Sequence, residues 1–87
     1  MKLISEYTPP TTEDLEQLKT ALGYTGNQMA DLAGIASNSQ WRKYTGGVEP
    51  RAMSLHILFF MSAQLVLSKN ELDCILTKMV DIGADIK

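Results

Sequence analysis

The polar side chains with the clearest chemical potential lie close together, at Asn38, Ser39, Gln40, Arg42 and Lys43. Asparagine and glutamine amides match the paired donor and acceptor on the edge of adenine, and arginine or lysine binds guanine or a phosphate. A serine hydroxyl contacts either kind of group. If these five side chains share one exposed surface, they are suited to binding double-stranded DNA.

The first element expected to position them is a helix that begins near residue 25. Thr25 and Gln28 have the spacing of a capping box, in which each side chain binds the backbone N–H of the other residue. Gly34 supplies the left-handed backbone that ends a helix. Between these signals the apolar residues recur at helical spacing and predict a buried stripe of Met29, Leu32 and Ala33.

A second helix is predicted after a short turn. Ser37 and Gln40 repeat the capping-box spacing, and the glycine pair 46–47 ends the helix. Trp41 and Tyr44, three residues apart, share a face that we expect to point into the core. The 100° step per residue then turns the polar residues outward: Ser39, Gln40, Arg42 and Lys43, with Asn38 at the exposed tip.

Two helices joined by a turn, the second with this polar face, form a helix-turn-helix arrangement over residues 25–47. An ordered set of residues in and just after this segment carries a family resemblance: Thr25, Met29, Ala30, Gly34, Ile35, Ser37, Trp41, Tyr44, Gly47 and Pro50. With these residues the segment resembles the lambda-repressor/Cro-like (XRE) family of phage and plasmid repressors. One departure is an extra residue in the turn, near positions 36 to 38.

The resemblance implies an all-α, five-helix lambda-repressor-like domain with a short N-terminal arm. It also implies a sequence-specific DNA-binding regulator, a repressor that binds a palindromic operator and is typical of a mobile genetic element. One short helix reads only a few base pairs, so we expect a homodimer that reads two half-sites. An alternative from another class is a protein-interaction module, such as an antitoxin or adaptor on the same scaffold.

Charge is distributed unevenly along the chain. The 87 residues contain 8 Lys+Arg and 10 Asp+Glu, a net charge of −2, which argues against a protein that coats nucleic acid without specificity. Residues 37–56 hold three cations and one acid, so their net charge is +2 and the remainder carries −4. We expect a small basic face on an acidic body, with Arg51 and Gln28 positioning the DNA backbone.

The N-terminal part is predicted to be an arm over residues 1–10, which two prolines separate from the first helix. Two interpretations of the arm stay open: a mobile tail packed by Tyr7, and an edge strand that pairs between subunits. Thr11 or Thr12 then begins a helix that ends at Gly23. Its buried stripe consists of Leu15, Leu18 and Leu22.

Two C-terminal helices are predicted over residues 54–83, within a single domain that covers 1–87. Ser54 can cap the first, which is apolar around nearly its whole circumference, so we expect it to be buried on more than one side. Ser68 and Glu71 form a third capping box. The apolar stripe of the last helix is expected to pack on the preceding helix or to form a dimer surface.

Several functional classes are not expected. The single His56 and single Cys74 have no partners at metal-ligand or triad spacing, and no glycine-rich phosphate loop is present. We therefore expect no enzyme activity, catalytic residue, metal, cofactor or small-molecule ligand. The N-terminus has acid and prolines where a signal peptide needs an apolar run, and the longest apolar run is too short for a bilayer. A cytoplasmic protein without a membrane partner is expected.

Overall fold

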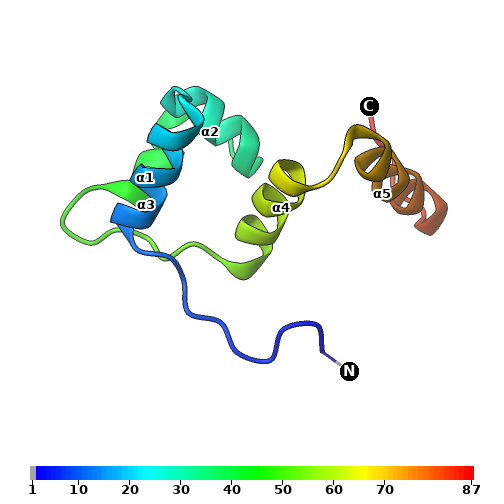
Figure 1. Cartoon of the computed structure of the whole chain (residues 1–87), viewed down its shortest axis with the longest axis horizontal. Coiled ribbons are helices and arrows are strands. Elements are labelled where there is room, and N and C mark those ends of the chain that lie inside the picture. Colours follow the sequence, from blue (N-terminus) through cyan, green and yellow to red (C-terminus); the bar gives the residue numbers. More distant parts are fainter. Residues whose placement is uncertain (1) are drawn as a thin grey trace.

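The computed structural model describes residues 2–87 and folds them into helices joined by loops (Figure 1). Within those residues there is no β-strand, so the predicted all-α class is confirmed. Both helices of the 25–47 segment are present. In chain order the helices are α1 (Thr12–Leu22), α2 (Gly26–Ala33), α3 (Asn38–Thr45), α4 (Leu55–Val66) and α5 (Lys69–Ile82).

Helices α1, α2 and α5 begin at capping boxes; those of α2 and α5 were predicted, whereas for α1 only a cap at Thr11 or Thr12 was predicted. Each N-cap hydroxyl accepts a hydrogen bond from the backbone N–H three residues on, and the side chain of that residue accepts the N-cap N–H in return. The pairs are Thr11 with Asp14, Thr25 with Gln28, and Ser68 with Glu71. The N–H and hydroxyl of the N-cap residue lower the pKa of the Asp14 and Glu71 carboxyls, because these hydrogen bonds favour the ionised form.

The capping box predicted at Ser37 is wrong. The Ser37 side chain makes no capping hydrogen bond. The N–H of Gln40, which a capping hydroxyl would bind, donates instead to the Ser37 carbonyl at 3.0 Å. The N–H of Asn38 donates to the side-chain oxygen of Asn27 at 3.2 Å, so α2 supplies a partner for the start of α3.

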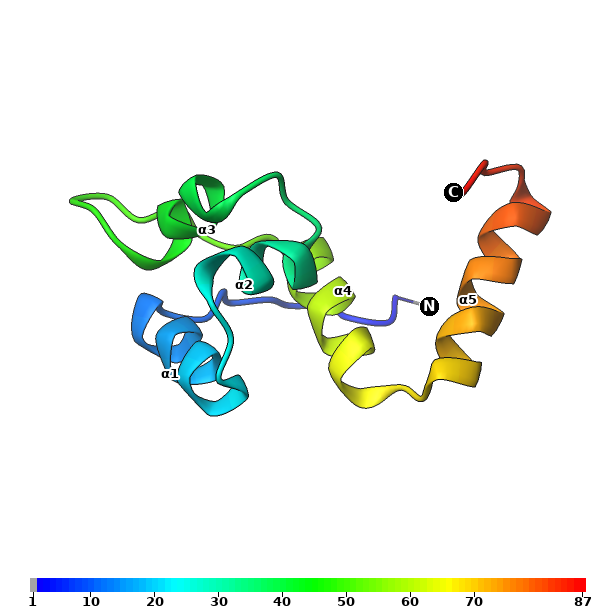
Figure 2. The same cartoon turned by 90° about the horizontal axis from the view of Figure 1, so that it is seen from above.

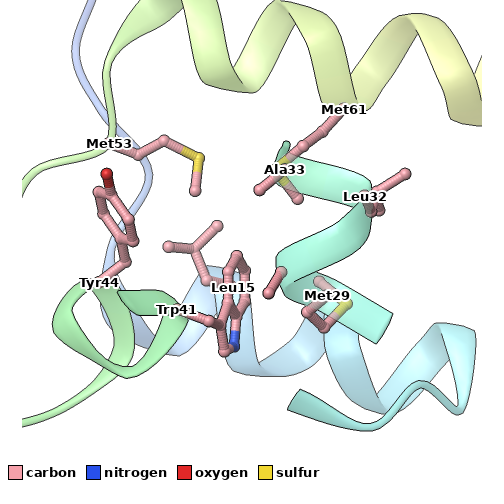
Figure 3. Close-up of a cluster of buried hydrophobic side chains, with 9 residues drawn as sticks. Leu15, Met29, Leu32, Ala33, Trp41, Tyr44, Met53 and Met61 are labelled. Atoms are coloured by element: carbon pink, nitrogen blue, oxygen red, sulfur yellow. The ribbon is translucent and has the colours of Figure 1, made fainter. Parts of the chain in front are cut away.

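The core lies where α2 packs against both α3 and α4, and where α1 packs against α3. Figure 3 shows side chains from these helices converging around the indole of Trp41. The buried side chains are all apolar or aromatic: Leu15, Met29, Ala30, Leu32, Ala33, Trp41, Tyr44, Met53 and Met61. Gln64 links α4 to the end of α2, because its side-chain amide Nε2 donates a hydrogen bond to the Leu32 carbonyl at 2.8 Å.

The glycines that end α1 and α2 form a matched pair of test positions. Both adopt left-handed backbone, with φ of +68° at Gly23 and +71° at Gly34. A Cβ at Gly34 would lie 3.0 Å from Cε2 of Phe60, whereas one at Gly23 meets nothing within 4 Å.

We expect Gly23→Ala to lower the free energy of unfolding by about 1–2 kcal/mol, the cost of left-handed backbone for a residue with a Cβ. Gly34→Ala should lose that amount and more, because the Phe60 ring must also move. Urea unfolding of both variants measures the difference. Equal losses would show that the ring moves aside without cost.

The N-terminal arm is anchored through Tyr7, whose hydroxyl donates to the Met53 carbonyl at 2.7 Å. Desolvation raises the pKa of this phenol. Ile4 and Tyr7 line a hollow of about 170 Å³ together with Leu58 and Phe59 of α4. Packing by Tyr7 is therefore observed, and residues 2–10 form no strand within the chain.

The last helix stands apart from the others. In Figures 1 and 2, α5 lies on the far side of α4 from α1, α2 and α3. None of its residues is buried, and the expectation that its apolar stripe packs on the preceding helix is not met within one chain. The sequence period correctly predicts an apolar face, but it does not specify what covers that face.

Candidate nucleic-acid interface

Helix α3 presents its polar side to solvent because its aromatic side is anchored in the core. Trp41 is 1% exposed and Tyr44 is 6% exposed, so the predicted inward orientation of both rings is confirmed. Ser39, Arg42 and Lys43 are exposed. At helical spacing these three side chains form one ridge along the outer surface of α3.

Two of the residues expected to contact base edges, Asn38 and Gln40, are less exposed than predicted. Asn38 is half-buried rather than at an exposed tip, because its amide group packs against Gly26 at the start of α2. A Cβ at Gly26 would overlap that amide, so a larger residue there would force the Asn38 side chain to move. Gln40 is also half-buried, at the flank of α3. The exposed ridge therefore consists of Ser39, Arg42 and Lys43.

The loop after α3 turns back and brings Arg51 beside this ridge. Gly47 adopts φ of +87°, a left-handed conformation that glycine accommodates without strain. The Arg51 N–H donates to the Lys43 carbonyl at 2.6 Å. The Arg51 guanidinium lies 5.8 Å from the centre of the Tyr44 ring, a cation–π contact. Residues separated in sequence thus meet at the end of α3.

Between the ridge and the loop lies an open groove of about 580 Å³. Three cationic side chains and one acid, Glu49, line it. Among residues 2–87 one ion pair forms, between Lys69 and Asp73 on α5, outside the groove. The cations of the groove therefore make no ion pair with a carboxylate of the described residues. These cations are Arg42, Lys43 and Arg51. They are available to neutralise a polyanion.

Gln28 does not join this group. Its side-chain oxygen accepts the Thr25 N–H at 2.8 Å as part of the capping box of α2. It lines a separate hollow of about 300 Å³, with Tyr24, Asp31 and Gln64. Of the seven residues expected to contact DNA, the groove brings together Ser39, Arg42, Lys43 and Arg51.

Sequence reasoning did not identify Thr45 and Glu49, which also line the groove. Neither belongs to the outward polar face that the helical period predicts for the second helix. The adjacent glycine pair 46–47 was the available signal, because consecutive glycines permit a tight reversal and close backbone approach.

Residues 2–87 contain no group of three His, Cys, Asp or Glu side chains placed to hold a metal ion. The same residues include no helix with the length and apolar character needed to cross a bilayer. Cys74 is exposed and unpaired.

Comparison with known proteins returns no match, whether to a protein-family model, a curated protein or a solved structure.

Proposed function

We propose that the protein is a sequence-specific DNA-binding transcriptional regulator. The observation that carries the proposal is the ridge of Ser39, Arg42 and Lys43, held outward by the buried Trp41 and accompanied by Arg51. Unpaired cations next to a hydroxyl, on the outer surface of a helix, are suited to the edges of bases and the phosphates of a major groove.

In this proposal α3 is the recognition helix. Its eight residues span about 12 Å at 1.5 Å per residue, the width of the major groove of B-form DNA. Arg42 and Lys43 contact guanine or phosphate, and Ser39 contacts a base edge or phosphate. Arg51 binds the phosphate backbone beside α3, because its guanidinium is already positioned over Tyr44.

Helices α2 and α3 serve as the two helices of the motif, as the resemblance to XRE-type regulators implies. One α3 reads only a few base pairs, so we propose a homodimer on a palindromic operator with half-sites one helical turn apart. We further propose that binding represses transcription in the cytoplasm, and that the protein regulates a mobile genetic element.

A second candidate function is a protein-interaction module of antitoxin or adaptor type. The observation that favours it is the set of large apolar side chains exposed on α4 and α5, among them Phe59 and Val66. The two candidates differ in which surface is functional: the groove at α3 in the first, and the apolar faces of α4 and α5 in the second.

Selection of bound duplexes from a random DNA pool at low salt tests the proposal. We expect enrichment of a short sequence repeated with two-fold symmetry, and weaker retention as salt rises. Failure to enrich any sequence, with retention no greater than that of an acidic protein without the ridge, would contradict it.

A further inference from the structure

A second surface of the chain is apolar and uncovered. We define the C-terminal apolar surface by six residues, each between 42% and 79% exposed: Phe59 and Val66 on α4, and Ile75, Leu76, Met79 and Val80 on α5. None of the six is charged, so this surface does not suit a nucleic acid. Large apolar side chains that are exposed together on a helix face mark surfaces that bind protein.

Helix α5 has little packing within the described chain, where Ile86 of the C-terminal tail lines a hollow of about 430 Å³ with Leu76 and Val80. Its 14 residues include none that is buried, and it does not belong to the helix pairs that pack together in the core. An isolated helix of about 12–15 residues is marginally stable in water, because most helical stability in proteins comes from packing an apolar face. The four apolar α5 residues therefore require a surface to pack on.

Helix α4 offers such a surface on its outer side. Its inner side is occupied, since Met61 is fully buried and Gln64 binds the end of α2. Phe59 and Val66 are seven residues apart and lie on one stripe, 52% and 79% exposed. One chain thus carries two apolar helix faces, and neither covers the other.

We propose that the C-terminal apolar surface is an interface between two copies of the chain, in which α5 of each copy packs across the outer face of α4 of the other. A two-fold arrangement covers both faces at once, since each copy supplies the helix that the other lacks. The six side chains of the C-terminal apolar surface present on the order of 500–600 Å² per chain, taking roughly 150–200 Å² for one whole side chain. A stable interface buries about 800 Å² per partner, of which about 65% is apolar in homodimers, so the six side chains match the apolar part of such an interface.

The proposed interface leaves the groove at α3 free. In Figure 2, α3 and α5 lie on opposite sides of α4, and none of the six residues of the C-terminal apolar surface lines the groove. The inference does not depend on DNA binding, because it rests on α4 and α5 alone.

Sedimentation velocity of the full chain without DNA, over a dilution series, tests the interface. We expect dimers in the wild type, and a dissociation constant raised by at least about 100-fold in Met79→Lys and in Val66→Lys, because each buries a charge. Lysine suits the C-terminal ends of both helices, so neither change should unfold the monomer. Cys74→Lys adds the same charge on the polar side of α5 and should dimerise like the wild type.

Circular dichroism of each variant distinguishes loss of association from loss of fold, and mixing the two variants gives a further test. A mixture of Met79→Lys and Val66→Lys chains should associate more tightly than either alone, because one intact contact between α5 and α4 remains. A wild type that stays monomeric would overturn the inference. So would dimers weakened by Met79→Lys but unaffected by Val66→Lys, since α5 would then pair only with α5.

Discussion

Replacing Arg42 and Lys43 together with alanine is expected to weaken DNA binding by at least about 100-fold, because each side chain contributes a charge-assisted contact to phosphate or guanine. Both are exposed and make no ion pair within the described chain, so the fold should be unaffected. The slope of log affinity against log salt should also fall, by about two, since two phosphate contacts are lost. A gel-shift titration at several salt concentrations measures both effects.

The matched control is Lys2→Ala with Lys87→Ala, which removes the same two positive charges from the two ends of the chain. Neither residue lines the groove. We expect this variant to bind DNA nearly as the wild type does, because position and not net charge decides binding. Equal weakening in both double variants would show that the ridge has no special role.

Trp41→Ala is expected to destabilise the fold more than any other single truncation in the core. Trp41 is 1% exposed at the centre of the core, and replacing a large buried aromatic residue with alanine costs about 3–5 kcal/mol. For a domain of this size that loss lowers Tm by roughly 12–40 °C. Net stabilities of small domains are only about 5–15 kcal/mol, so partial unfolding at ambient temperature is expected.

Thermal unfolding followed by circular dichroism measures the loss, with Val48→Ala as the control because Val48 is fully exposed. The indole Nε1 has no hydrogen-bond partner in the described chain, so the loss should come from packing rather than from a broken hydrogen bond. Trp41→Phe, which keeps a ring and removes the unpaired N–H, should lose clearly less. A Tm close to that of Val48→Ala would show that the core does not depend on this residue.

The helix starts could be predicted from sequence because they depend on residues three apart. Thr25 and Gln28, or Ser68 and Glu71, meet within a single turn wherever the rest of the chain lies. The start of α3 could not be predicted in the same way. Its partner is the side chain of Asn27, 11 residues earlier, which the fold brings to the Asn38 N–H.

The part of the candidate site that lies on one helix could be predicted, because it depends on local spacing. Helical spacing placed Ser39, Arg42 and Lys43 outward once Trp41 pointed inward, which is what the structure shows. It could not predict that Asn38 would turn toward Gly26, because that contact joins two helices.

The residues from outside the second motif helix were equally hard to place. Arg51 is positioned by its contact with Tyr44, and that contact depends on the path of the loop after α3. A loop has no regular spacing of apolar residues from which its path could be predicted. The period of α5 predicted its apolar face but gave no information about what covers that face.

The most direct measurement of the central claim is the perturbation of backbone amide NMR signals when a selected DNA duplex is added to the labelled protein. The account predicts the largest changes at Ser39, Arg42, Lys43 and Arg51, around the groove beside α3. Perturbations confined to α4 and α5, or none at low salt, would contradict it.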